Sequence, residues 1–188
     1  KALQRAADLL EERRGALLHL LQVEAGKTLD DALSEVREAV DFLRYYAAEA
    51  RRLFGGPVAL VGPTGETNSI ELRGRGPFAC ISPWNFPLGL VIGPLAAAIA
   101  AGNCCIVKLT DLCPATAAVA ARIIKESFDE REVALFEGGV DVATALLELP
   151  FNHIFFTGST RVGKLVMAAA AKHLATVTLE LGGKSPVI

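Results

Sequence analysis

The sequence predicts an α/β protein, namely a Rossmann-like open parallel sheet with helices on both faces, preceded by a helical arm and a short hairpin. From Phe78 onward, short apolar runs alternate with helical stretches in the order βαβαβαβαβ, and parallel strands require such crossovers. The residues before 54 carry helical periodicity, and a segment rich in turn residues separates the two parts. We therefore expect a helical arm over 1–54, a hairpin connector over 55–77 and a dinucleotide-binding domain over 78–188.

The helical arm has a start signal and one apolar face. Thr28-Leu29-Asp30-Asp31 resembles a capping box, which marks the first turn of a helix. Apolar residues then recur at spacings of three and four, so they line one side of that helix. These residues are Leu33, Val36, Val40, Leu43 and Ala47. Core packing explains this face, and we assign no chemistry to it.

The remaining elements follow from turn residues and apolar runs. Two β-like runs, Val58–Val61 and Ser69–Arg73, lie in the connector and predict a hairpin. Further strands are expected at 78–81, 104–108, 133–136, 153–157 and 176–181, and helices at 88–101, 115–128, 142–149 and 161–173. Sheets of this kind bind ligands at the carboxyl ends of their strands.

The composition excludes several classes of protein. Of the 188 residues, 52% are hydrophobic and 21% are charged, which is typical of a globular domain. The net charge is −2 and no basic stripe is present, so we expect no nucleic acid partner. Gly76–Val107 is uncharged and long enough to span a bilayer, but its prolines and polar residues argue against a span. We expect a cytoplasmic protein without a membrane partner.

The cysteines and the ends of the chain lead to two further expectations, one about metal and disulfide sites and one about the extent of the chain. Cys80, Cys104, Cys105 and Cys113 show neither a CxxC metal pairing nor the density of a disulfide scaffold, so we expect small buried residues and no metal site. The chain opens on KALQRAADLL, without an initiator Met or a signal segment, and we expect both ends to be cut.

The segment HIFFTGSTRVGK predicts an anion site where a strand passes through a glycine turn into a helix. Ser159 and Thr160 can cap this helix, so free N–H groups and the helix dipole point at one spot. The residues from Gly158 to Lys164 match the P-loop pattern GxxxxGK, but Leu165 stands where the metal-binding hydroxyl belongs. A phosphate site and an ordinary capped helix both remain open.

Four polar side chains are candidates for catalysis or binding. Asn85 follows a strand between prolines, where its amide suits an oxyanion hole, unless it only caps the next helix. Lys108 and Asp111 end the next strand, where they can meet ribose hydroxyls, unless they form an exposed pair. Glu180 stands beside a Gly-Gly turn, where a carboxylate could be positioned as a general base.

Four ordered motifs resemble the aldehyde dehydrogenase superfamily over essentially the whole chain. They are Ile81-Ser-Pro-Trp-Asn-Phe-Pro87, Lys108-Leu-Thr-Asp111, Phe156-Thr-Gly-Ser-Thr-Arg-Val-Gly163 and Leu179-Glu-Leu-Gly-Gly183. Residues 1 to about 90 resemble the dehydrogenase half of proline utilisation A, which oxidises glutamate semialdehyde. The rest is similar to the class 3 and fatty-aldehyde branch. This resemblance implies an NAD(P)-dependent enzyme that oxidises an aldehyde to a carboxylic acid, and a parent enzyme that forms homo-oligomers.

The resemblance also implies roles for individual residues. Asn85 would donate to the oxyanion of a thiohemiacetal, and Glu180 would activate the water that hydrolyses a thioester. NAD or NADP would be held by a larger set: Ile81, Pro83, Trp84, Lys108, Asp111, Gly158, Ser159, Val162, Gly163, Leu181 and Gly182.

The sequence departs from the family pattern at two points. The ribose carboxylate is Asp111 instead of a glutamate, and no cysteine matches the context of the family's nucleophile. We therefore expect a truncated dehydrogenase that is inactive by itself, with a stand-alone nucleotide-binding module as the alternative. A P-loop NTPase is a third hypothesis, which Leu165 disfavours.

Overall fold

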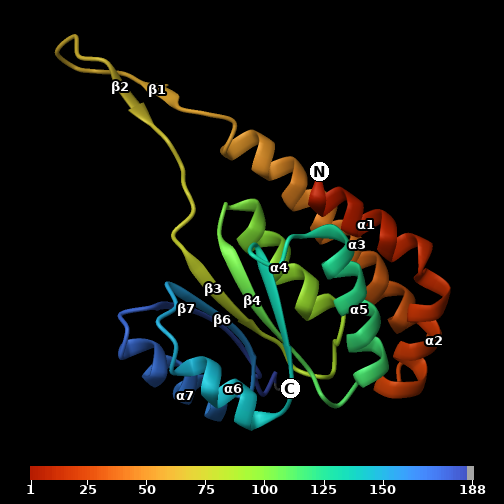
Figure 1. Cartoon of the computed structure of the whole chain (residues 1–188). Coiled ribbons are helices and arrows are strands. Elements are labelled where there is room, and N and C mark those ends of the chain that lie inside the picture. Colours follow the sequence, from red (N-terminus) through yellow and green to blue (C-terminus); the bar gives the residue numbers. More distant parts are fainter. Residues whose placement is uncertain (186–188) are drawn as a thin grey trace.

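The computed structural model describes residues 1–185, and its elements follow the predicted order (Figure 1). The helices are α1 (Ala2–Glu12), α2 (Arg14–Ala25), α3 (Leu29–Leu53), α4 (Gly89–Ala100), α5 (Pro114–Ser127), α6 (Val140–Leu147) and α7 (Thr160–Ala171). The strands are β1 (Val58–Leu60), β2 (Asn68–Ile70), β3 (Pro77–Ile81), β4 (Cys104–Leu109), β5 (Val133–Glu137), β6 (His153–Gly158) and β7 (Thr176–Leu181).

Five of the described strands form one parallel sheet in the order β5-β4-β3-β6-β7. The chain starts in the centre at β3, moves outward through β4 and β5, and then crosses back to β6 on the other side of β3. The strand order therefore reverses beside β3, and an open α/β sheet binds its ligand at such a switch point. The expected Rossmann-like fold with helices on both faces is confirmed.

The helical arm packs directly on one face of this domain. α3 contacts α4, while α1 and α2 contact α5, and the buried side chains of all five helices form one apolar cluster with β3 and β4 (Figure 1). The start of α3 is as predicted, because the Thr28 hydroxyl oxygen accepts a hydrogen bond from the Asp31 N–H at 3.1 Å. Of the expected apolar face, four residues are buried and Leu33 is half-buried.

The opposite face of the sheet is covered by α6 and α7, which enclose a second, smaller cluster. It is built on Ile154 and Phe156 of β6, with Val166 and Ala170 of α7 packed on them. Phe155, which lies between Ile154 and Phe156, packs against the first cluster. Successive side chains of β6 therefore point to opposite faces of the sheet. The sheet is sandwiched between two apolar layers.

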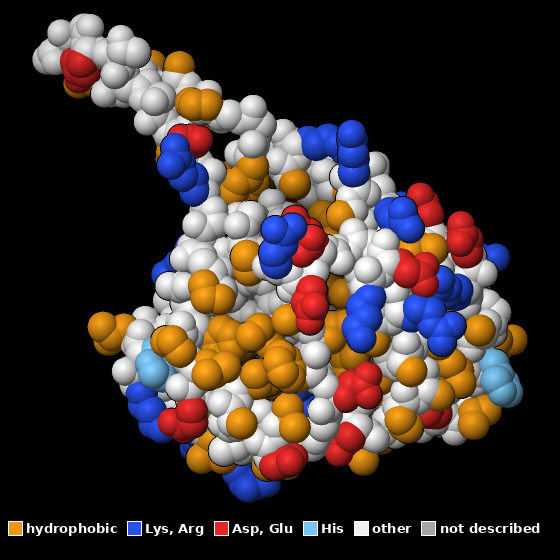
Figure 2. All heavy atoms as spheres, viewed as in Figure 1, with side chains coloured by type: hydrophobic (Ala, Val, Ile, Leu, Met, Phe, Trp, Pro, Cys, Tyr) orange, Lys and Arg blue, Asp and Glu red, His pale blue; other side chains and the backbone are white. Residues whose placement is uncertain are grey.

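The hairpin of β1 and β2 extends away from the rest of the molecule as a narrow projection (Figures 1 and 2). Its strands pair antiparallel, with Val58 opposite Ile70, and both side chains are exposed. Figure 2 also shows acidic and basic side chains interleaved over the helical arm, without a basic stripe on the face in view.

One expectation about the core is wrong and several boundaries move. Cys80, Cys105 and Cys113 are buried as expected, but Cys104 is exposed because it begins β4 at the amino edge of the sheet. α6 begins at Val140, two residues earlier than predicted, because Gly139 serves as its N-cap. Among residues 1–185, no helix is long and apolar enough to cross a membrane, and no group of three or more metal-ligating side chains is found.

Candidate functional site

A cavity of about 860 Å³ opens at the carboxyl ends of the strands, between the β3 loop and the α6–α7 layer. Its volume lies within the range of small-molecule and cofactor sites. Eight of the residues predicted to bind the coenzyme line it together: Ile81, Pro83, Trp84, Lys108, Asp111, Gly158, Ser159 and Val162. The structure therefore brings these eight together from separate stretches of sequence.

The amino terminus of α7 faces this cavity with unused hydrogen-bond donors. Ser159 is the N-cap, and its hydroxyl oxygen accepts from the Val162 N–H at 3.3 Å. Within the helix, the N–H groups of Thr160 and Arg161 have no earlier turn to bond to. Together with the helix dipole, these two groups form a binding place for an anion such as a phosphate.

Gly158, the last residue of β6, lies in close contact with the side chain of Phe156. A Cβ added at Gly158 would lie 2.5 Å from Cζ of Phe156, whose ring is 7% exposed and forms part of the cavity wall. A larger residue would push that ring into the space that a ligand needs. The glycine therefore lets the backbone and the aromatic wall approach the ligand from the same side.

Lys108 supplies a cation from the end of β4. Lys108 is 8% exposed whereas Asp111 is exposed, and among the described residues no salt bridge joins them, so they do not form the exposed ion pair that was the alternative. Burial lowers the pKa of the Lys108 ammonium group, and the negative charges of Asp111 and Asp141 partly offset this effect. The result is a desolvated cation flanked by carboxylates, an arrangement suited to hydroxyl groups of a ribose.

Three predicted coenzyme residues lie outside the cavity lining. Gly163 is inside α7, and a Cβ there would meet Cδ2 of Leu181 at 2.7 Å, so it lets α7 pack closely on β7. The Gly182 N–H donates to the Gly158 carbonyl at 3.3 Å. The position of Gly163 also argues against a P-loop, since the backbone from Thr160 onward is helix and not a phosphate-wrapping loop.

Asn85 lies in the loop between β3 and α4, at the carboxyl edge of the sheet. It does not cap α4, whose N-cap is Leu88, and among the described residues its amide makes no hydrogen bond. The side chain is exposed and available to a ligand. The alternative in which Asn85 only caps the helix is therefore wrong.

Glu180 lies in the edge strand β7, opposite Thr157 of β6. It lines a separate cavity of about 180 Å³ with Gly89 and Leu90, the first residues of α4 after the Asn85 loop. The Glu180 carboxylate therefore faces the α4 side of the sheet, while the large cavity extends toward α6 and α7. Thr157 borders both cavities.

The cysteines are poorly placed for attack on a substrate. Burial raises the pKa of the Cys113 thiol, which lies 3.6 Å from the Trp84 carbonyl oxygen. A contact with Cys105, together with burial, raises the pKa of Cys80 well above its usual value. Cys104 is exposed at the opposite, amino edge of the sheet. None of these thiols combines thiolate character with a place beside Asn85 and Glu180.

Two glutamates that the sequence analysis did not single out shape the carboxyl edge. One carboxylate oxygen of Glu35 accepts from the N–H groups of Leu88 and Gly89 at 2.8 and 2.9 Å, which caps α4. Glu24 accepts from the N–H groups of Ala115 and Thr116 at 2.8 and 2.7 Å, which caps α5. No local pattern predicts these contacts, because each joins residues that are far apart in sequence.

The fold and this arrangement agree with the comparisons with known proteins. The model of the family described as "Aldehyde dehydrogenase family" matches residues 1–188. The chain belongs to the aldehyde dehydrogenase family. The Bacillus subtilis protein named "Putative aldehyde dehydrogenase AldX" is 62% identical over 114 residues, which are 61% of this chain and 26% of that protein. Aldehyde dehydrogenase family 3 member A2 of Macaca fascicularis is 50% identical over 117 residues, 62% of this chain and 24% of that protein.

Solved structures of the same family share the fold. Proline utilisation A of Bradyrhizobium japonicum superposes with a TM-score of 0.91 at 44% identity, over 97% of this chain and 19% of that one. Both branches suggested by the sequence, proline utilisation A and class 3 aldehyde dehydrogenase, are thus among the relatives. The chain spans about a quarter or less of the length of these three proteins.

Proposed function

We propose that this chain supplies the coenzyme cradle, the oxyanion donor and the general base of an NAD(P)-dependent aldehyde dehydrogenase that oxidises an aldehyde to a carboxylic acid. The observation that carries the proposal is the carboxyl edge of the sheet. There, a cofactor-sized cavity on one face lies next to the Asn85 loop and to a second cavity that contains Glu180.

The large cavity fits the chemistry of a dinucleotide. The free N–H groups at the start of α7 suit a pyrophosphate, and Lys108 with Asp111 suits ribose hydroxyls. Val162 and Leu165 provide apolar wall for a flat base. When bound, the nicotinamide supplies the acceptor for the hydride that leaves the substrate carbon. Gly163, Leu181 and Gly182 would contribute through the backbone and packing beneath this cradle.

Asn85 and Glu180 act on the substrate side. A thiolate adds to the aldehyde carbon and the carbonyl oxygen becomes an oxyanion, which the Asn85 amide stabilises by donating an N–H. After hydride loss leaves a thioester, the Glu180 carboxylate takes a proton from water as that water attacks the carbonyl carbon. The carboxylic acid and the thiolate are released. Because the cysteines described here are buried or remote, we assign the thiolate to a part of the protein beyond these residues.

The substrate proposal rests on relatives and is kept at class level. One relative over 99% of this chain is the bifunctional protein PutA of Rhizobium meliloti, at 38% identity. That similarity favours glutamate semialdehyde as a first compound to test among aldehydes. An aldehyde is proposed as the small-molecule partner, with homo-oligomerisation proposed for the full-length protein and cytoplasm as its location.

The test uses the full-length protein that contains this chain, with NAD(P)H formation followed for a panel of aldehydes. Asn85→Ala should lower kcat by about 100- to 1000-fold, because one oxyanion donor is lost, and should leave nucleotide affinity unchanged. Glu180→Gln should retain a burst of NAD(P)H while steady turnover falls, because deacylation is blocked. A normal kcat for Asn85→Ala, or joint loss of burst and turnover in Glu180→Gln, contradicts the assigned roles.

A further inference from the structure

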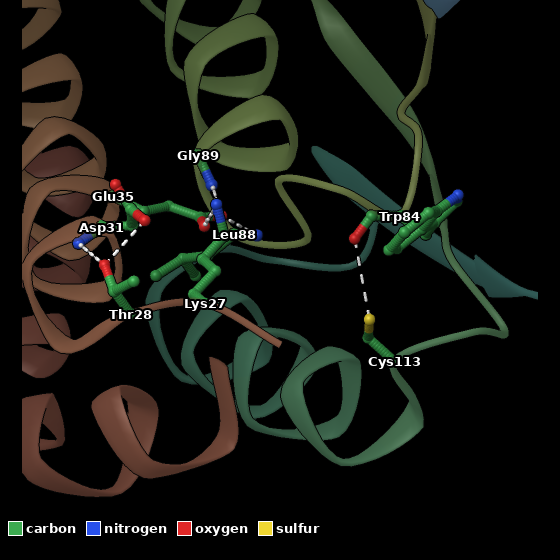
Figure 3. A network of polar contacts seen from close by, with 8 residues as sticks. All are labelled: Lys27, Thr28, Asp31, Glu35, Trp84, Leu88, Gly89 and Cys113. Atoms are coloured by element: carbon green, nitrogen blue, oxygen red, sulfur yellow. Dashed lines mark hydrogen bonds and ion pairs between the residues drawn. The ribbon is translucent and has the colours of Figure 1, made fainter. Parts of the chain in front are cut away.

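A buried ion pair from the helical arm lies beneath the loop that carries Asn85. Nζ of Lys27 is 3.0 Å from one carboxylate oxygen of Glu35, and these side chains are 9% and 0% exposed (Figure 3). Lys27 precedes α3, and Glu35 lies within it, whereas the Asn85 loop lies some fifty residues further along the chain. The contact therefore joins the arm to the carboxyl edge of the sheet.

Glu35 holds the end of this loop in place. Its other carboxylate oxygen accepts from the backbone N–H groups of Leu88 and Gly89 at 2.8 and 2.9 Å, as Figure 3 shows. Charge-assisted bonds of this kind are short and strong, and a carboxylate at a helix amino terminus also interacts favourably with the helix dipole. The first turn of α4 is thus tied to α3 by its backbone.

Lys27 holds the middle of the loop. Its ammonium group lies 3.6 Å from the centroid of the Phe86 ring, next to Asn85 in sequence, which is a cation–π contact. The backbone of Lys27 is itself fixed, because Gly26 ends α2 in a left-handed conformation with φ of 65° and Thr28 caps α3. One side chain therefore connects the Glu35 carboxylate to the residue beside Asn85.

Helix stability alone does not require this arrangement. A buried ion pair is on average no more stabilising than an apolar pair of the same volume. Asparagine is also a preferred N-cap, yet the cap of α4 comes from Glu35, and among the described residues the Asn85 amide has no partner. The distant cap leaves the Asn85 amide free while the chain that follows Asn85 is anchored through the Phe86 ring and the Leu88 and Gly89 N–H groups.

We propose that Lys27 and Glu35 are positioning residues that fix the Asn85 loop for its role at the oxyanion. The proposal rests on the proposed function of Asn85, but its structural part is tested without substrate. Trp84 is the only tryptophan of the chain, it is 49% exposed, and it directly precedes Asn85. Its fluorescence therefore reports on the loop.

The first experiment measures quenching of Trp84 by acrylamide in the 188-residue chain, at temperatures where circular dichroism shows the native fold. Lys27→Met removes the cation, and Glu35→Ala removes both the cap and the ion pair. Each should raise the quenching constant, by at most about twofold because half of the ring is already exposed. The double variant Lys27→Met with Glu35→Gln keeps a neutral acceptor for the cap, so it should recover the part of the change that comes from the unpaired carboxylate, while the part that comes from the lost Phe86 contact should persist.

The control is Glu126→Ala, which removes a different contact between the arm and the domain. Glu126 of α5 receives two hydrogen bonds of 2.7 Å from Arg13, away from the Asn85 loop. This variant should leave Trp84 quenching unchanged. Equal quenching in Lys27→Met and the unmodified chain, or an equal rise in the control, overturns the proposal.

The second experiment uses the full-length protein. Lys27→Met should lower kcat by up to about 100-fold, as a misplaced catalytic group does, with an unchanged dissociation constant for the nucleotide and only partial recovery in the double variant. If Lys27→Met changes the quenching of Trp84 but leaves kcat normal, the positioning role is wrong, provided that Asn85→Ala lowers kcat. If Asn85→Ala is normal, the proposed function fails instead, so the two failures are separable.

Discussion

Replacing Lys108 by methionine is expected to weaken nucleotide binding and to stabilise the fold at the same time. Lys108 is 8% exposed, and among the described residues no carboxylate oxygen lies within 4.0 Å of its ammonium group. Its charge is therefore partly desolvated at the cavity wall and lacks an ion-pair partner among the described residues, which is unfavourable for folding. Methionine has a similar length and no charge, so the desolvation cost disappears with little change in packing.

The expected magnitudes follow from the lost bond and the removed charge. A hydrogen bond from a charged donor contributes about 1.5 to 3 kcal/mol, which corresponds to a dissociation constant about 10- to 150-fold weaker. Stability should rise by about 1 kcal/mol, or about 2 to 4 °C in Tm for a chain of this size.

The pH dependence of the free energy of unfolding gives an independent test of the buried position of Lys108. Because burial lowers the pKa of Lys108 in the folded state, the unfolded chain binds more protons between that lowered pKa and the ordinary lysine value of about 10.4. Stability should therefore rise with pH through this window in the original chain, and this contribution should be absent from Lys108→Met.

Titration calorimetry with NAD and NADP, together with thermal unfolding by circular dichroism, measures these effects. The matched control is Lys164→Met, since Lys164 is exposed on α7 and does not line the cavity. It should leave both affinity and Tm unchanged. An unchanged dissociation constant for Lys108→Met refutes its role as a ligand, and a weaker constant with a lowered Tm shows that the loss comes from unfolding.

Three further outcomes are expected. Gly158→Ala should cost about 1 to 3 kcal/mol in urea unfolding because its Cβ collides with the buried Phe156 ring, whereas Gly183→Ala, which has open space around it, should be close to neutral. Glu24→Ala should cost about 1 to 2 kcal/mol at neutral pH through the lost cap. Burial raises the pKa of Glu24, but the hydrogen bonds from α5 outweigh this effect and lower it. The difference in unfolding free energy between the original chain and Glu24→Ala should therefore shrink as pH falls through this lowered pKa. A difference that stays constant with pH argues against the cap. The pure 188-residue chain should form no NAD(P)H with any aldehyde, and aldehyde-dependent formation refutes the assignment of the thiolate elsewhere.

The parts of the fold that the sequence predicted are those with a local signal. The strand from His153 and the helix after Ser159 are marked by an apolar run, a glycine and a cap within a few residues. The same holds for Thr28, whose hydroxyl and Asp31 lie one helical turn apart. Eight of the positions predicted to bind a coenzyme meet in one cavity because they lie at or after the carboxyl ends of strands in a parallel sheet, so their shared edge could be inferred.

The parts that were missed depend on contacts between distant segments. Nothing near Glu35 or Glu24 indicates that these side chains leave their own helices to cap α4 and α5. The exposure of Cys104 depends on which strand end it occupies, and the outlying position of Gly163 depends on where α7 begins. Hydrophobic pattern fixes which face of an element is buried, but it does not say which partner a buried carboxylate finds.

These distant caps also explain why an anionic ligand would favour one face of the sheet. Four helices begin at the carboxyl edge, and each presents the positive end of its dipole there. At α4 and α5 that end already binds the carboxylates of Glu35 and Glu24. On the other face, α6 carries Asp141 in its first turn, whereas α7 has Ser159 as its N-cap and no acidic residue in its first turn, so α7 is the helix that offers its amino terminus to an anion. A dinucleotide pyrophosphate would be repelled by carboxylates on the first face and would find free N–H groups on the second. By supplying carboxylates to α4 and α5, the helical arm would therefore favour the α7 face for the proposed coenzyme and leave the α4 side to the proposed roles of Asn85 and Glu180.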